Sequence, residues 1–119
     1  MPRISTRVMV DVDKTSGIEF PVEVHYNAAD DRGWIVGRIT VQSVCHQYSS
    51  CYEFEAKVYV VPSKYGIEGG SISKLCVKDV NSDTATEVIG YDRGWYLKPQ
   101  CLQDHAALKA ILMIFDTSM

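Results

Sequence analysis

The sequence has no uninterrupted run of about 18 apolar residues, the length that a membrane-spanning helix requires. Its first residues, Met1 to Arg7, also lack the hydrophobic stretch of a secretion signal. Together these two absences predict a soluble protein that remains in the cytoplasm.

Positive charge is also scarce. The sequence has 12 Lys and Arg against 15 Asp and Glu, a formal net charge of −3, which disfavours non-specific binding to nucleic acid. Hydrophobic residues at 46% and charged residues at 23% are typical of a folded globular chain. Because 119 residues are enough for one core of ordinary size, we expect residues 1–119 to form a single domain.

Patterns for metal binding and nucleophilic catalysis are missing. The sequence contains no Cys-x-x-Cys pair, and the irregular spacing of its cysteines and histidines disfavours a zinc site. The adjacent residues Cys45 and His46 would point to opposite sides of an extended segment, and no two carboxylates lie together in an apolar setting. We therefore expect a protein that is not an enzyme and holds no cofactor. Without a secretion signal, the cysteines are expected to be reduced thiols: Cys45, Cys51, Cys76 and Cys101.

Apolar and polar residues alternate along about six short segments, which is the periodicity of strands. In the clearest segment, Tyr52 and Phe54 share one side while Glu53 occupies the other. Pro21 lies inside the second segment and removes a backbone donor, so we expect this strand at a sheet edge or with a bulge. The predicted strands are Arg7 to Asp13, Ile18 to Tyr26, Trp34 to Ser43, Cys51 to Val61, Ser71 to Lys78 and Thr86 to Tyr91.

The periodicity changes after Pro99. From Gln103 to Phe115 apolar residues recur at helical spacing, and Asp104 is placed to cap the start of the helix. A lone amphipathic helix must bury its apolar stripe against the sheet. The predicted fold class is therefore α+β: an antiparallel sheet of about six strands with one C-terminal helix packed on it. The stripe consists of Leu108, Ile111, Leu112 and Phe115.

The tetrapeptide Asp-Arg-Gly-Trp occurs twice, at Asp31 to Trp34 and at Asp92 to Trp95. We interpret both copies as one recurrent turn, in which glycine supplies a positive φ and tryptophan begins the next extended segment. Aromatic and arginine side chains gather beside these turns. They are typical of packing and interface positions, and they would also suit stacking on a nucleotide.

Glycines concentrate between Tyr65 and Gly70, just before a predicted strand. This loop is either a hairpin connection or an anion cradle built from backbone amides. Arg93 could hold a phosphate or carboxylate, and Trp95 could stack on a ring. The predicted ligand-binding residues are Lys64, Tyr65, Gly66, Gly69, Gly70, Lys74, Arg93 and Trp95.

Several segments carry a family resemblance: Trp34 to Ile39, Tyr52 to Tyr59, Tyr65 to Leu75 and Tyr91 to Trp95. With them the chain resembles a family of small uncharacterised proteins encoded by phages and prophages, over about residues 34 to 115. An N-terminal hairpin and the insertion Val44 to Ser50 lie outside that pattern. The resemblance implies a compact accessory protein and supplies no catalytic residues. In size and layout the chain is also similar to the Thoeris anti-defence sponges, which bind a cyclic adenine-nucleotide signal between subunits.

These observations lead to one leading hypothesis: a phage-type anti-defence protein that binds and sequesters a small nucleotide-like signal in the host cytoplasm. Its small ligand would be anionic. Two alternatives stay open: an inhibitor that binds a host defence complex, and a structural accessory protein with no small ligand. We also expect a homo-oligomer, a dimer or higher, because several apolar side chains exceed what a small core can hide. These are Trp34, Trp95, Tyr96, Met113 and Ile114.

Overall fold

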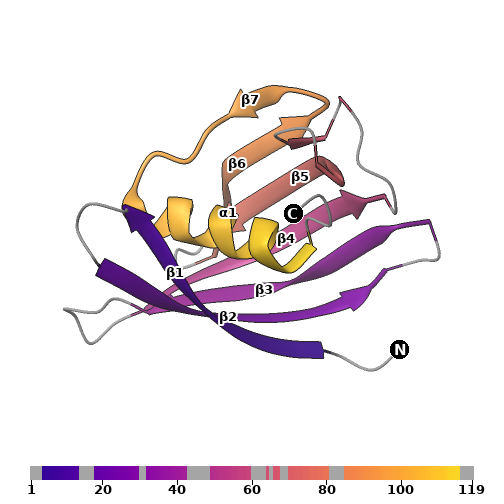
Figure 1. Ribbon diagram of the computed structural model, residues 1–119. Helices are drawn as coiled ribbons and strands as arrows, with labels where there is room; N and C mark the ends of the chain where they lie inside the picture. Colours follow the sequence, from indigo (N-terminus) through magenta and orange to yellow (C-terminus); the bar gives the residue numbers. More distant parts are fainter. Residues whose placement is uncertain are drawn as a thin grey trace.

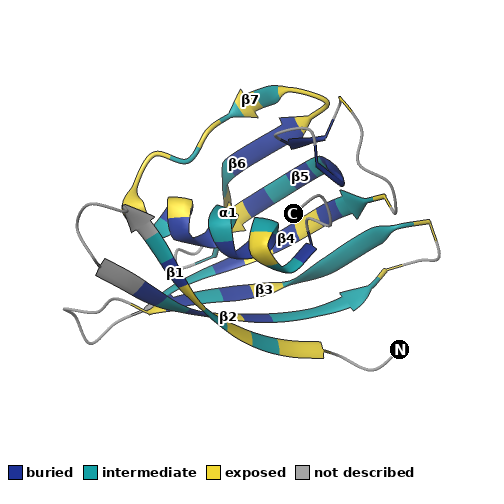
Figure 2. Ribbon diagram, in the orientation of Figure 1, coloured by how far each residue is buried: buried dark blue, intermediate teal, exposed yellow. Residues whose placement is uncertain are grey.

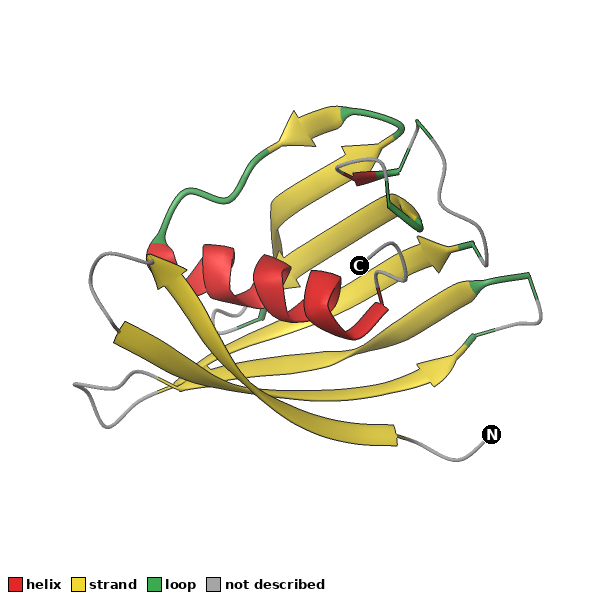
Figure 3. Ribbon diagram, in the orientation of Figure 1, coloured by secondary structure: helices red, strands yellow, loops and turns green. Residues whose placement is uncertain are grey.

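Seven strands and one helix make up the regular structure of the computed structural model (Figures 1 and 3). It describes residues 4–13, 18–29, 32–42, 49–59, 64, 66–67, 70–80 and 85–115. The elements are β1 (Ile4–Asp13), β2 (Ile18–Ala28), β3 (Trp34–Gln42), β4 (Ser49–Val58), β5 (Ile72–Asp79), β6 (Thr86–Asp92), β7 (Trp95–Leu97) and α1 (Leu102–Phe115). The α+β class predicted from the sequence is confirmed, with β7 as an additional strand.

All seven strands form one antiparallel sheet in sequence order, from β1 at one edge to β7 at the other. A meander needs no crossover connection, because each strand is antiparallel to the next one in the chain. The expectation that Pro21 marks an edge strand is wrong, since β2 lies between β1 and β3. However, the register of β2 with β3 begins at Val22, so Pro21 pairs only with Met9 of β1 and its missing N–H disturbs no bond to β3.

Helix α1 covers one face of the sheet, and the strongly twisted strands curve around it (Figure 1). Alternate residues of the strands belong to the hydrophobic core beneath the helix. Figure 2 colours the buried residues dark blue. They include Val22, Ile39, Tyr52, Phe54, Val77 and Ile89. The opposite face carries no helix among the described residues.

The buried side of α1 differs from the predicted stripe. Ile111 and Phe115 are buried as expected, while Leu108 and Leu112 are only partly buried. The rest of the contact is made by three fully buried alanines, whose small side chains let the helix approach the strands closely: Ala106, Ala107 and Ala110.

Asp104 has a different position from the one expected. The helix begins at Leu102, so Asp104 lies within its first turn instead of capping it. Its side chain is buried and accepts a hydrogen bond from the Tyr52 hydroxyl of β4, with 2.8 Å between the oxygens. Asp104 therefore joins the helix to the sheet.

The described parts of the two Asp-Arg-Gly-Trp copies, residues 32–34 and 92–95, differ in backbone conformation. Gly33 has a φ of 101°, as predicted, and its carbonyl accepts a hydrogen bond from the Val58 amide. In the second copy the residue with positive φ is Arg93, at 59°, and the Asp92 amide bonds to the Gly94 carbonyl. The prediction of one recurrent turn is therefore wrong at the second copy. There the residue in the left-handed conformation is the arginine, one position before the glycine.

Candidate functional site

The face of the sheet opposite α1 is lined with polar and aromatic side chains. In each strand these are the residues that alternate with the buried ones, so strand periodicity alone places them together on one side. We call this side the open face. Its described central residues are His25, Asn27, Trp34, Val36, Arg38, Glu53, Glu55, Lys57, Lys74, Cys76, Lys78 and Tyr96.

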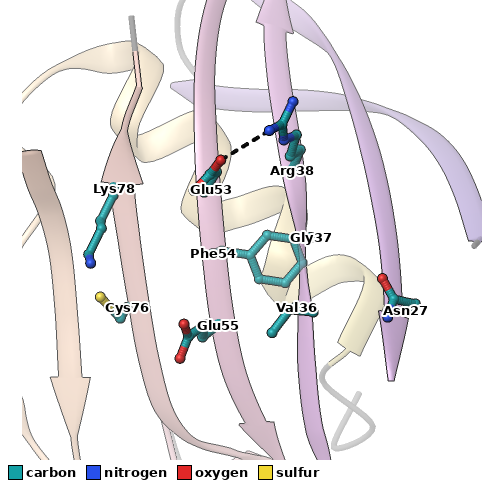
Figure 4. Close-up of a pocket in the computed structure, with 9 residues that line it drawn as sticks. All are labelled: Asn27, Val36, Gly37, Arg38, Glu53, Phe54, Glu55, Cys76 and Lys78. Carbon is teal, nitrogen blue, oxygen red and sulfur yellow. Dashed lines mark hydrogen bonds and ion pairs between the residues drawn. The ribbon is translucent and has the colours of Figure 1, made fainter. Parts of the chain in front are cut away.

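A hollow of about 250 Å³ lies on the open face over β3, β4 and β5 (Figure 4). Gly37 and Phe54 lie at its centre, and α1 lies behind the strands. A Cβ on Gly37 would come within 2.9 Å of the Phe54 ring and 2.2 Å of the His25 carbonyl oxygen. Only glycine therefore fits this point of the sheet.

Charged side chains of both signs surround this hollow. Arg38 donates to Glu53 across β3 and β4, at 3.2 Å between Nη2 and Oε1. Lys78 is the register partner of Glu53 on β5 but has no ion-pair partner in the part of the chain described. Glu55 and Cys76 face each other in the next row. The hollow thus offers both cationic donors and carboxylate acceptors.

Cys76 belongs to a small hydrogen-bonded cluster with Glu87 and Tyr96. Its thiol donates to Glu87 Oε2 at 2.8 Å, and the Tyr96 hydroxyl donates to the same oxygen at 3.3 Å. Burial, followed by the Glu87 carboxylate, raises the pKa of the Cys76 thiol to about 11. Near neutral pH the thiol keeps its proton, so it acts as a donor and is a poor nucleophile. Burial and Glu87 also raise the pKa of Tyr96.

A second hollow of about 150 Å³ adjoins the first and shares Glu55 and Cys76 with it. Trp34 and Tyr96 supply aromatic rings to it, and Lys74 supplies a cation. The Tyr96 ring lies over Gly90, where a Cβ would come within 2.2 Å of it. We call the two hollows together the open-face groove.

Two of the predicted ligand-binding residues lie at one end of this groove. Lys74 lines the second hollow, with its amine 3.9 Å from the Asp92 carboxylate. The Arg93 amide donates to the Ser73 carbonyl at 3.1 Å, which fixes the second turn beside Lys74. The structure therefore brings Lys74 and the backbone of Arg93 together.

The other predicted residues lie elsewhere. Gly66 and Gly70 are buried, and the Gly70 amide bonds to the Ile67 carbonyl at 2.9 Å. Trp95 packs against the core through an edge-to-face contact with Tyr91, with 5.0 Å between ring centroids. Lys64 is exposed. Tyr65 and Gly69 lie outside the described residues, as do Cys45 and His46.

The buried glycines have a structural role in the loop. A Cβ on Gly66 would lie 1.9 Å from the Gly70 carbonyl oxygen, so two parts of the loop approach each other at this point. The Gly70 amide is already used within the loop. Of the two interpretations drawn from the sequence, these contacts favour a packed connection over an anion cradle.

Several residues of the groove could not be identified as neighbours from the sequence. Strand periodicity places Glu55, Cys76 and Lys78 on the polar sides of their strands. It does not tell which of them are neighbours, because strand order and register are not encoded in any local pattern. Trp34 ends the first repeated turn and Tyr96 follows the second, 62 positions later in the chain. Pairing of β3 with β4, β4 with β5 and β5 with β6 places them in one hollow.

The fold and the groove define an α+β protein whose antiparallel sheet has one face under a helix and the other face open and polar. The chain belongs to the family described as Domain of unknown function (DUF7678), whose model matches residues 31–116. This match covers β3 to α1 and leaves the hairpin of β1 and β2 outside it. No curated protein and no solved structure matches the chain.

No helix among the described residues is long and apolar enough to cross a membrane. In the same part of the chain, no group of three or more His, Cys, Asp and Glu side chains is arranged to hold a metal ion.

Proposed function

We propose that this protein is a non-enzymatic binding protein that holds a small anionic, nucleotide-like ligand in the open-face groove. The observation that carries the proposal is a pair of like charges. Lys57 of β4 and Lys74 of β5 are direct register partners on the open face. Two cations in such a cross-strand position repel each other. An anion bound between them would attract both and offset this repulsion.

The existing contacts of the two lysines leave their charges only partly balanced. The Lys57 ammonium lies 5.4 Å from the centre of the Trp34 ring and 5.8 Å from that of Tyr59. Lys74 reaches Asp92 only at 3.9 Å, which is beyond hydrogen-bond length, and its side chain is 41% exposed. Both amines therefore keep donors for a phosphate oxygen.

The rest of the groove suits a nucleobase. Trp34 and Tyr96 present aromatic rings in the same hollow as Lys74, and ring faces of this kind stack on bases regardless of base identity. The Glu55 carboxylate lies in the same hollow and would accept hydrogen bonds from the exocyclic amine of a base. Adjacent cationic and aromatic groups thus match the two ends of a nucleotide.

The chemistry of the groove supports binding without reaction. Its nucleophile candidate, the Cys76 thiol, is kept protonated by burial and by Glu87, with a pKa raised to about 11. Together with the resemblance to small phage-encoded proteins, this supports sequestration of a nucleotide-like host signal as the biological role. Such a protein acts by lowering the free concentration of its ligand and needs no catalytic group.

Isothermal titration calorimetry with a cyclic di-adenylate, ADP-ribose, AMP and adenosine tests the proposal. We expect the phosphorylated compounds to bind and adenosine to bind more weakly. Lys74→Ala removes a charge-assisted hydrogen bond of about 1.5–3 kcal/mol, which is more than a tenfold loss of affinity. Tyr96→Ala removes one stacking ring, at a cost of about 1–3 kcal/mol.

Arg7→Ala is the matched control. It also deletes one cation, but on β1, at the far edge of the sheet from β5. We expect it to bind like the parent. The proposal is wrong if no phosphorylated compound binds the parent at millimolar concentration, or if Lys74→Ala and Tyr96→Ala both bind as tightly as the parent. Co-purification of a host protein in the absence of nucleotide binding would instead favour the inhibitor alternative.

A further inference from the structure

Strand β1 forms an edge of the sheet along ten residues, Ile4–Asp13. Edge strands present alternate backbone N–H and C=O groups to solvent, and long ones are usually protected by prolines, lysines or a covering segment. Within Ile4–Asp13 there is neither proline nor lysine. This edge is therefore a template for pairing with another strand.

The middle of the edge is apolar and exposed. Met9 is 50% exposed at the centre of β1, and its side chain lies on the open face next to Pro21. A second strand paired at this position would bury part of the Met9 side chain, and that burial would favour association.

The charges on either side of Met9 are arranged symmetrically. Arg7 lies two residues before Met9 and Asp11 two residues after it, so all three belong to the same face of the strand. If a second β1 pairs antiparallel with the first about a two-fold axis at Met9, each Arg7 comes opposite the Asp11 of the other copy. Both ion pairs would then flank a central methionine pair.

The Asp11 carboxylate has an oxygen atom without a hydrogen-bond partner among the described residues. This oxygen, Oδ1, is enclosed. The Asp11 residue as a whole is only half-buried, so its carboxylate can still be approached at the edge by an arginine, which would balance its charge. The main chain at Asp11 is held in place, because Lys109 of α1 donates a hydrogen bond to its carbonyl. The edge is therefore ordered before pairing, which lowers the entropic cost of association.

We propose that two copies of this chain associate through antiparallel pairing of their β1 strands about a two-fold axis at Met9, with reciprocal Arg7 and Asp11 ion pairs. The partner is a second copy because the strand is complementary to itself. The seven-stranded sheets of the two copies then become continuous. Since β1 is at the far edge from β5, β6 and β7, this dimer leaves the open-face groove uncovered, and it stands independently of the proposed function.

The pairing can be tested with variants in which the charge of Arg7 or Asp11 is reversed, using analytical ultracentrifugation to measure their oligomeric state. The parent should sediment at twice the 13.3 kDa of one chain at micromolar concentration and low salt. Arg7→Asp places two acids opposite each other in a homodimer, and Asp11→Arg places two bases, so each variant alone should be monomeric. An equimolar mixture restores both attractive pairs and should form a heterodimer. The double variant Arg7→Asp/Asp11→Arg should form a homodimer again.

A second experiment does not depend on these variants folding. Directly opposed Cα atoms in an antiparallel ladder are about 4.5–5.5 Å apart, within the range of a disulfide. Met9→Cys should therefore oxidise to a covalent dimer. Ile4→Cys, on the same strand and 47% exposed, should not, because it lies five residues from the axis.

The proposal is overturned if the parent is monomeric, if either single charge variant remains a dimer, or if Ile4→Cys cross-links as fast as Met9→Cys. Dimerisation of the mixture but of neither single variant supports it. Titration with AMP of the monomeric Arg7→Asp variant reports separately on the groove, so failure of one proposal is distinguishable from failure of the other.

Discussion

Tyr52 and Asp104 form a buried polar contact that joins β4 to the first turn of α1. The two side chains are 1% and 6% exposed, and their oxygens are 2.8 Å apart. The N-terminal end of a helix favours a negative charge, which suits Asp104 at this position. The contact therefore fixes the position of the helix on the sheet, in addition to the apolar packing.

We expect Tyr52→Phe to lower the free energy of unfolding by about 1–3 kcal/mol, because it removes the Tyr52 hydroxyl as a donor to the buried Asp104 carboxylate. Chemical denaturation at pH 7 measures this change. Tyr59→Phe is the matched control, since Tyr59 is 46% exposed and should lose almost nothing.

The same contact predicts how stability depends on alkaline pH. Burial and the Asp104 contact raise the pKa of Tyr52, whereas a tyrosine in the unfolded chain ionises near pH 10. The stabilisation is therefore complete below about pH 10 and declines as the pH rises further. Tyr52→Phe should reduce this decline. An equally steep decline in the variant would contradict the assignment.

At the scale of single elements, the buried face of α1 agrees only in part with the apolar stripe predicted from its sequence. Ile111 and Phe115 of the predicted stripe are buried, whereas Leu108 and Leu112 are only partly buried. Three alanines that the stripe did not include are completely buried. Alanine carries little weight in a hydrophobic pattern. In the structure the three alanines belong to the same hydrophobic core as the strands.

We expect Ile111→Ala to destabilise the protein by about 2–5 kcal/mol, because Ile111 is completely buried between α1 and the sheet. Met113→Ala is a control on the same helix, where the side chain is 44% exposed, and should change stability by less than about 0.5 kcal/mol. Thermal and urea unfolding of both variants provide the measurement. Equal losses in the two variants would mean that the helix faces the sheet differently.

For the molecule as a whole, the hairpin of β1 and β2 is as much a part of the core as the segment that matches the family. The family match begins at residue 31, but the hairpin supplies Val10, Val22 and Val24, which are completely buried. In addition, Lys109 of α1 bonds to the main chain of β1. One hydrophobic cluster thus extends from β1 to α1.

We therefore predict that residues 31–119 do not fold stably on their own. Removing β1 and β2 exposes the apolar side of α1 and the edge of β3. Circular dichroism and thermal unfolding of the shortened chain, compared with the parent, test this. A cooperative transition close to that of the parent would show that the hairpin is dispensable for folding.

The sequence by itself determined the class of fold, the approximate limits of six strands and the helix, and which side of each strand is polar. These features follow from periodicity within a single segment, and a segment carries that information without its neighbours. The short strand β7 was missed because three residues, Trp95–Leu97, are too few to show alternation. The prediction of an edge position from Pro21 was wrong because the effect of its missing N–H depends on where the pairing with β3 ends.

Only the tertiary structure decided which polar residues meet. Lys57 and Lys74 belong to different strands, and a shift of either strand by one residue would move its entire polar set to the buried face. Of the residues predicted beside Lys74 in the glycine loop, Gly66 and Gly70 are buried. The side chains that share a hollow with Lys74 come from distant parts of the chain: Trp34, Glu55 and Tyr96. Strand order and register arise from packing of the whole core, so the groove could not be identified from any one segment.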